Sequence, residues 1–282
     1  MRLTIRSAEP TALLDALRPD KHIRLLWEKR SLILQLVRRE VVGRYRGSLL
    51  GTLWTVLLPL AGVLVYTFVF GYIFKTRWPG LATASVSHAL VLWAGLAVFS
   101  SFSEVLQRAC SVIPAHPNLV KRVAFPLEIL PVMLVGTSLI PFTISLLMVT
   151  FGLRLILHAW PEFSCLLLAL LCFVIWLQGI AWLFAGIGTF LRDLAPMVQG
   201  LLPLIMFLSP IFYPLEAIPE SIRGWFWLNP LTTILELIRS SLLSTAWPPG
   251  IACYGLVVLS LTSWLLGACI FSRLRPEMAD VV

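Results

Sequence analysis

The sequence NLVKRVAFPLEILP, residues 118–131, carries two adjacent cations and two prolines between long apolar runs. Because proline fixes φ and restricts the residue before it, Pro126 and Pro131 predict a short, rigid connection. Lys121 and Arg122 give this connection a positively charged surface. Such a surface can dock a protein partner, or it can be a solvated cap whose charge only helps to set the orientation of a membrane protein.

The sequence LRDLAP, residues 191–196, predicts a second and tighter connection of the same kind, with Arg192 beside Asp193. The same two interpretations apply to it.

The chain contains none of the common catalytic or nucleotide-binding motifs. It has no Gly-Lys dipeptide, and so no phosphate-binding loop for ATP, and neither G-x-S-x-G nor H-E-x-x-H occurs. Its five cysteines and four histidines lack ligand spacing, so no zinc site is predicted. Glu104 and Arg108 lie one helical turn apart and are expected to pair with each other.

The composition predicts an integral membrane protein. Hydrophobic residues make up 59% of the chain and charged residues only 13%, with a mean hydropathy of +0.89. A soluble domain carries about 25% charged residues. Most of the net charge of +8 lies in the first 48 residues, which indicates positive charge facing the cytoplasm rather than nucleic-acid binding.

Six apolar segments are long enough to be transmembrane helices, which need about 20 apolar residues. If the N-terminus is cytoplasmic, 17 of the 22 Lys and Arg residues lie on the inside and 5 on the outside. This bias predicts that both termini, the tails 1–22 and 273–282, are cytoplasmic, together with the two charged connections. The predicted spans, within a transmembrane domain at 48–272, are 49–74, 88–108, 126–152, 163–190, 200–218 and 251–271.

Two further helices are expected that do not cross the membrane. Residues 23–47 form a basic amphipathic segment, which either lies in the cytoplasmic interface or packs on the protein's own cytosolic side. Residues 229–243 begin with Asn229 as a helix N-cap and Pro230 at the first helical position. This segment is too short to span the bilayer, so it is predicted to be a re-entrant or interfacial helix on the periplasmic side.

Several blocks of the sequence, taken together, resemble the membrane subunit of ABC-2 type polysaccharide exporters. This family includes the permeases for O-antigen, capsule and teichoic acid, and the resemblance to the O-antigen branch is strongest. The blocks keep the family's order and span nearly the whole chain. They are RREVVGRYRGSLLGTLWTVLLPL (38–60), YTFVFGYIF (66–74), NLVKRVAFPLEILP (118–131), LRDL (191–194), FLSPIFYPLEAIP (207–219) and LNPLT (228–232).

The resemblance implies an all-α fold of the ABC-2, type V exporter kind and a homodimer in the bacterial inner membrane. It also implies two copies of a separate cytosolic ATPase, which would bind ATP and Mg, so that this subunit is not an enzyme and holds no cofactor. The charged connections would then couple the ATPase to the membrane helices. The implied coupling residues are Asn118, Leu119, Lys121, Arg122, Phe125, Pro126, Arg192 and Asp193.

The implied substrate is a polysaccharide linked to polyprenyl pyrophosphate. Arg44, Tyr45 and Arg46 suit the entrance for the pyrophosphate, because arginine binds phosphate with a planar fork. Ile234 and Ile238 are expected to form an outer gate between two subunits. Aromatic rings suit sugar faces, although each could equally be a lipid-facing or interhelical ring. The expected channel aromatics are Trp54, Tyr66, Phe70, Phe207, Phe212 and Tyr213.

Two other classes of function compete with this one. An ion-coupled flippase for lipid-linked glycans would need carboxylates within the membrane, and the predicted spans offer no chain of them. A membrane glycosyltransferase would need catalytic carboxylates or a histidine in an outer loop. The outer segments contain only Glu162, Glu216, Glu220, Glu236 and His158.

Overall fold

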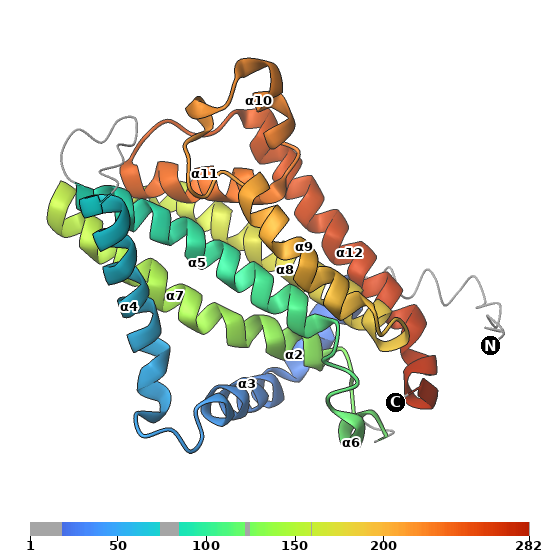
Figure 1. Ribbon diagram of the computed structural model, residues 1–282. Coiled ribbons are helices and arrows are strands. Elements are labelled where there is room, and N and C mark those ends of the chain that lie inside the picture. The colour runs from blue at the N-terminus through green and yellow to red at the C-terminus, as the bar shows by residue number, and fades with distance from the viewer. Residues whose placement is uncertain (1–18, 74–84, 122–124, 159, 282) are drawn as a thin grey trace.

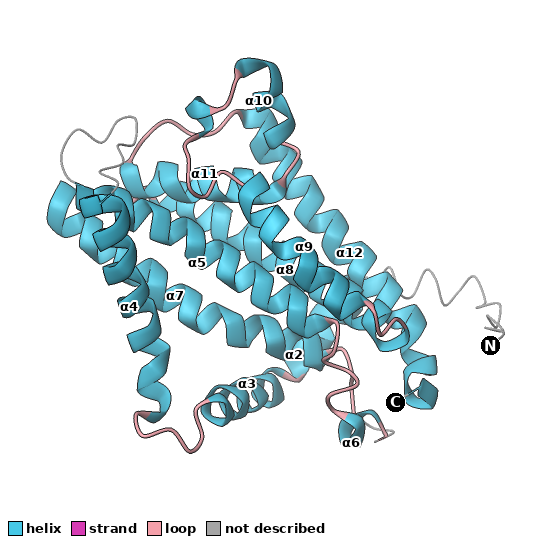
Figure 2. Cartoon of the chain, in the orientation of Figure 1, coloured by secondary structure: helices cyan, strands magenta, loops and turns pink. Residues whose placement is uncertain are grey.

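The computed structural model describes residues 19–73, 85–121, 125–158 and 160–281, and these residues form helices and loops without a strand (Figure 2). The all-α prediction is therefore confirmed for this part of the chain. Among the described residues, five helical segments are long and apolar enough to cross a membrane, which makes the chain a multi-pass membrane protein. They are Gly51–Phe70, α5 (Ser85–Ala109), α7 (Ile129–Leu157), α8 (Phe163–Phe190) and α12 (Gly250–Val281).

The first of these spans consists of three consecutive helical pieces. A 3-10 turn, η1 (Gly51–Leu53), leads into α4 (Trp54–Tyr66), which continues as the π-helical segment η2 (Thr67–Ile73). π-helical turns are rare and occur frequently at functional sites. Only 11% of the residues in the first span are buried within the chain, against 72% in the span His88–Ala109 of α5. Much of the first span is therefore open to lipid or to another protein.

The predicted fifth span is wrong in its bounds. Instead of 200–218, the structure has α9 (Leu194–Leu208), a helix of 15 residues that is about 22 Å long and shorter than the hydrocarbon core. The helix stops because Pro210 disfavours helical geometry at Ser209, which is extended with ψ of 139°. The chain then turns through residues 209–214 and a 3-10 turn, η3 (Leu215–Ala217).

The last helix is longer than its hydropathy predicted. α12 continues to Val281 through most of the segment 273–282, which was predicted to be a cytoplasmic tail. Arg275 in this extension donates a hydrogen bond of 2.6 Å to the carboxylate of Glu128, which precedes α7. The ion pair fixes the end of α12 against the start of α7.

The long helices run between two ends of the molecule, and the short helices gather at these ends (Figure 1). Segments predicted to lie on the same side of the membrane lie at the same end. The end predicted to be cytoplasmic carries α2 (Pro19–Glu28), α3 (Arg30–Arg44) and α6 (Pro117–Val120). The opposite end carries α10 (Glu220–Phe226) and α11 (Pro230–Leu243).

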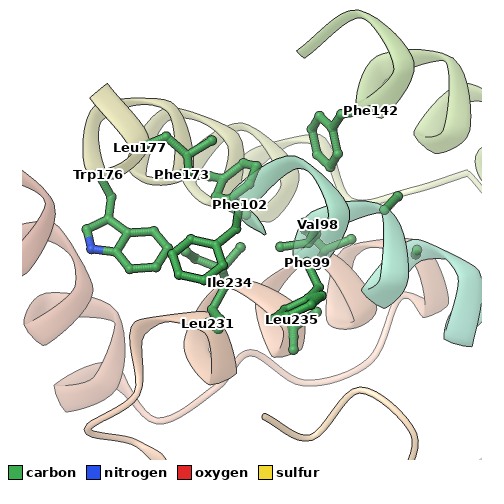
Figure 3. Packing of buried hydrophobic residues seen from close by; sticks show 14 of the residues in the cluster. Val98, Phe99, Phe102, Phe142, Phe173, Trp176, Leu177, Leu231, Ile234 and Leu235 are labelled. Carbon is green, nitrogen blue, oxygen red and sulfur yellow. The ribbon is translucent and has the colours of Figure 1, made fainter. Parts of the chain in front are cut away.

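The predicted start of α11 is confirmed. The side chain of Asn229 accepts a hydrogen bond of 3.0 Å from the backbone N–H of Leu231, and Pro230 occupies the first turn. The helix is not exposed on the surface of the protein: α11 is buried among α5, α8 and α12, and its predicted re-entrant or interfacial position stays a prediction. Figure 3 shows Leu231 and Ile234 beside Phe102 and Trp176, whose stacked rings have centroids 5.2 Å apart.

Polar residues on α11 are compatible with this burial because they are small or paired. Thr232, Thr233 and Ser241 are buried, and short hydroxyl side chains fit between packed helices. Arg239 donates to the carboxylate of Glu236 at 2.8 Å and to the carbonyl of Ile211 at 2.9 Å. The second bond ties α11 to the turn that follows α9.

Candidate functional site

An ion-pair cluster joins α3 to α5 at the end of the molecule predicted to be cytoplasmic. Arg108 donates to Glu104 at 3.1 Å, which confirms the expected pair, and it also pairs with Glu40 on α3. Arg44 on α3 pairs with Glu104. We call Glu40, Arg44, Glu104 and Arg108 the inner ion-pair cluster; its four charges alternate in sign and sum to zero.

The helix α3 also packs on α7. A Cβ atom added to Gly136 of α7 would lie 2.9 Å from Cγ2 of Val37, so these two helices approach closely. The predicted segment 23–47 is interrupted at Lys29, where α2 ends and α3 follows. The close approach supports the second interpretation of this segment, packing on the protein's own cytosolic side, although Trp27 and Leu34 remain exposed.

A groove of about 940 Å³ lies between α3 and the segment that contains α6. Arg38, Arg39 and Arg46 line it, and none of the three has an ion-pair partner among the described residues. Asn118 and Leu119 line the opposite wall. We call this cavity the arginine groove; its three exposed guanidinium groups are suited to an anionic ligand.

The predicted entrance residues Arg44, Tyr45 and Arg46 do not act as one group. Arg46 is exposed and lines the arginine groove, whereas Arg44 is paired with Glu104 in the inner ion-pair cluster. Tyr45 is half-buried and caps the end of α3. Sequence reasoning singled out Arg44, whose charge is neutralised, whereas it included Arg38 and Arg39 only as part of the basic amphipathic helix.

The first predicted coupling segment forms a short rigid projection. α6 begins with Pro117 and spans four residues, the last of which, Val120, is buried. Asn118 and Lys121 are exposed, whereas Leu119 packs against the core. Phe125 also packs there and Pro126 is half-buried, so the projection is anchored at both sides. The predicted residue Arg122 lies outside the described residues.

The second predicted coupling segment lies at the same end of the molecule. Arg192 and Asp193 are exposed in the turn between α8 and α9, and Asp193 directly precedes α9. Neither side chain forms an ion pair in the described part of the chain. The two charged connections thus present exposed side chains on the same end, as docking to a common partner requires.

Four of the six predicted channel aromatics form one row of ring contacts. Tyr66 and Phe70 stack with centroids 5.7 Å apart, Phe70 lies 6.3 Å from Phe212, and Phe212 lies 6.0 Å from Phe207. The row extends to Trp93 of α5, 5.6 Å from Tyr66, which sequence reasoning missed. The row therefore connects α5, the first span and the end of α9.

The other two predicted aromatics have different surroundings. The hydroxyl of Tyr213 donates to the carbonyl of Phe207 at 2.8 Å, which steadies the turn after α9. Trp54 lies at the opposite end of α4 from Tyr66, and its indole N–H donates to Ser48 at 2.9 Å. Trp54 is therefore not part of the aromatic row.

The predicted outer gate is contradicted. Ile234 is 0% exposed and Ile238 is 1% exposed, and both belong to the core formed with α5 and α8. A second subunit cannot reach either side chain. The helical spacing of these residues was a signal of burial within one chain rather than of a contact between two.

The inner ion-pair cluster should show measurable coupling between α3 and α5. We expect Arg108→Gln to destabilise the protein by about 1 kcal/mol, because Glu40 loses its partner in a partly buried site. A double-mutant cycle with Glu40→Gln, followed by thermal unfolding in detergent, measures the coupling. The same cycle on the exposed pair Arg24–Glu28 is the control and should show almost none. Equal coupling in both cycles would contradict a structural role for the cluster.

Long apolar helices, a charged end with two exposed connections and a row of aromatic contacts characterise this chain as a multi-pass membrane protein. Within the described residues, no group of three His, Cys, Asp or Glu side chains is placed to hold a metal ion. The family model of the ABC-2 type transporters matches residues 31–243, so the chain belongs to this family.

Three similar proteins have related names. The chain is 29% identical to the O-antigen export system permease protein RfbA of Myxococcus xanthus, over 92% of this chain and 98% of the relative. It is 25% identical to the RfbA protein of Klebsiella pneumoniae, over 89% and 95%. It is 27% identical to the polysialic acid transport protein KpsM of Escherichia coli, over 86% and 92%. The polysaccharide-export permeases of the ABC-2 family are thus its relatives along nearly the whole chain.

Proposed function

We propose that this chain is the permease subunit of an ATP-driven exporter that moves a polyprenyl-pyrophosphate-linked polysaccharide across the bacterial inner membrane. O-antigen is the first candidate for this polysaccharide. The observation that carries this proposal is the match to O-antigen permeases over nearly the full length of both chains. The aromatic row supports it, because sugar rings stack on aromatic faces through their C–H groups.

The energy for export comes from a separate ATPase, present in two copies. This part of the proposal is supported by the sequence, which has no phosphate-binding loop. It is also supported by α6 and the 191–193 turn, which expose Asn118, Lys121, Arg192 and Asp193 at one end. Rigid, anchored segments transmit motion of a bound partner to α5, α7, α8 and α9 without absorbing it.

The functional unit is a homodimer with the polysaccharide path between the two subunits. The open surface of the first span supports this, since only 11% of its residues are buried in a single chain. α9 adds exposed apolar residues, among them Leu204, Phe207 and Leu208. In this dimer the aromatic row lines the path, and α9 together with the turn after it serves as the sixth membrane-embedded element.

The pyrophosphate of the carrier lipid binds first in the arginine groove. Arg38, Arg39 and Arg46 are exposed in the groove, so their guanidinium groups can make bidentate contacts with phosphate oxygens. The exposed Trp27 and Leu34 on α2 and α3 suit contact with the inner leaflet, which supports a position of the groove at the depth of lipid headgroups.

A capsule exporter is the second candidate, and the similarity to the polysialic acid transport protein favours it. The two candidates share the fold, the ATPase and the direction of transport. They differ in the sugar, which the exported material itself would identify.

The proposal is tested by purifying the chain with the ABC ATPase encoded beside its gene. We expect a stable complex with vanadate-sensitive ATPase activity, and cells that lack this chain should accumulate lipid-linked polysaccharide on the cytoplasmic side. Failure to bind any ABC ATPase, or normal surface polysaccharide in the deletion strain, would contradict the proposal.

The orientation is tested by labelling single cysteines from outside intact cells. We expect labelling at Ser221→Cys on α10 but not at Asn118→Cys on α6, since both side chains are exposed and lie at opposite ends. Background from Cys110 should be low: burial raises the pKa of its thiol to about 11, so it stays protonated and unreactive near pH 7. Labelling of Asn118→Cys in intact cells would reverse the orientation and remove the coupling role of α6.

A further inference from the structure

The C-terminal end of α12 packs into the small hydrophobic core that supports α6, at the same end of the molecule (Figure 1). Phe271 and Met278 of α12 are both fully buried in this core. Val120 of α6 belongs to the same core, and Leu119 and Phe125 on either side of Val120 pack against it. The last helix of the chain and the projection formed by α6 therefore rest on one another, although they are far apart in the sequence.

An ion pair joins the same two regions. Nη1 of Arg275 on α12 lies 2.6 Å from Oε1 of Glu128, two residues after Pro126, where the projection ends. The side chain of Glu128 is only 6% exposed, whereas that of Arg275 is 43% exposed. Within the described ranges, no second cation forms an ion pair with Glu128. The buried carboxylate therefore depends on a residue of α12 for its counter-charge.

The backbone of Glu128 is held as well, by α8. The indole N–H of Trp182 donates to the carbonyl of Glu128 at 3.1 Å. The ring of Trp182 also contacts that of Trp264 on α12, with centroids 5.7 Å apart. Glu128 is thus attached to α12 through its side chain and to α8 through its carbonyl. A displacement of the rigid projection must be passed to this residue, because only Leu127 separates it from Pro126.

We infer that Glu128 and Arg275 are positioning residues that join the projection to α12, so that a movement of α6 also moves α12. The chain itself connects α6 only to α5 and α7, and the ion pair adds a helix that the chain does not connect. The apolar contacts of Phe271 and Met278 are non-directional, whereas the ion pair fixes one register. Separating the pair would leave Glu128 buried and unpaired, which costs more than breaking an exposed pair. The inference rests on the proposed function, which supplies the ATPase that moves α6.

The test measures export and ATP hydrolysis by the complex of the full-length chain with its ATPase, each per amount of folded complex. We expect Arg275→Ala to lower export by about tenfold while ATP hydrolysis continues, a loss within the range found for residues that couple two sites. Arg275→Lys should retain most of the export, because lysine keeps the charge for this single contact. Arg273→Ala is the matched control and should export normally: Arg273 is exposed on the same helix and forms no ion pair in the described part of the chain.

A double variant separates a positioning role from a purely structural one. Arg275→Ala alone leaves a buried carboxylate unpaired and should lower the melting temperature, whereas Glu128→Leu combined with Arg275→Ala removes both charges and should restore it. Export by the double variant should stay low, because the connection to α12 is still missing.

The inference is overturned if Arg275→Ala exports normally, if that variant loses ATP hydrolysis and export in parallel, or if the double variant recovers export together with its melting temperature. The wild-type complex tests the proposed function separately. If the wild-type complex neither hydrolyses ATP nor exports polysaccharide, the proposed function fails. If it does both and the two variants export as well as it does, only the role of the ion pair is removed.

Discussion

Replacing Gly267 with alanine is expected to disrupt the packing of α12 on α8 and to lower stability severely. A Cβ atom at this position would lie 2.1 Å from the carbonyl oxygen of Gly179, which is closer than any real contact. The obstacle is backbone, so no side chain can rotate to relieve it. Overpacking of this kind costs about 1–3 kcal/mol or more, and here it must separate two long helices. Thermal unfolding followed by size-exclusion chromatography measures the loss.

Gly255 on the same helix provides the matched control. A Cβ atom there meets nothing within 4 Å, so Gly255→Ala adds only helix propensity. We expect a gain of up to about 1 kcal/mol from that substitution. Equal melting temperatures for the two variants would show that α8 and α12 do not meet through Gly179 and Gly267.

This close crossing also explains why small residues lie deep in these spans. Membrane helices associate without the hydrophobic driving force that operates in water, so they depend on van der Waals packing. Glycine improves this packing because it lets the two backbones approach closely. Gly188, near the C-terminal end of α8, allows a second close approach of this kind: an added Cβ atom there would lie 2.2 Å from the carbonyl oxygen of Cys110. α8 is thus fitted closely to both α12 and the end of α5. A helix held in this way can transmit a movement of the charged connections.

The sequence alone predicted those elements whose signal is local. The apolar run 163–190 coincides with α8, and the cap formed by Asn229 and Pro230 marks the start of α11. The end of α9 also had a local signal, the proline that follows Ser209, although a hydropathy window averages over it. Local signals therefore fixed where helices lie along the chain, with errors where apolar residues continue past a proline.

The sequence could not predict which distant residues meet. Glu104 and Arg108 are one turn apart and were paired correctly, whereas Arg44 is 60 residues from Glu104 and Glu40 is 68 residues from Arg108. Their contacts depend on how α3 packs on α7. The burial of α11 is of the same kind: an amphipathic stripe reveals a helix face that must be covered, but not whether lipid, a second subunit or the chain itself covers it.

Introducing proline at Leu119 is expected to abolish export while leaving the protein folded in the membrane. The backbone N–H of Leu119 donates to the carbonyl of His116 at 2.9 Å, and proline removes that donor from α6. The half-buried leucine side chain, which packs on the core beside Val120, is lost as well. The projection then loses its rigidity, so in the proposed transporter closure of the ATPase would no longer move α5 and α7.

The measurement compares surface polysaccharide with the amount of membrane-inserted protein in cells. Glu220→Pro is the control, because it places proline at the first residue of α10, at the opposite end of the molecule, where a helix tolerates it. That variant should export normally. ATPase activity of the purified complex adds a second readout: in Leu119→Pro, hydrolysis should continue without transport, since the proposed function assigns the nucleotide sites to the partner. Normal export by Leu119→Pro would show that α6 does not couple the two proteins, and loss of the protein from the membrane would show that α6 is needed for folding instead.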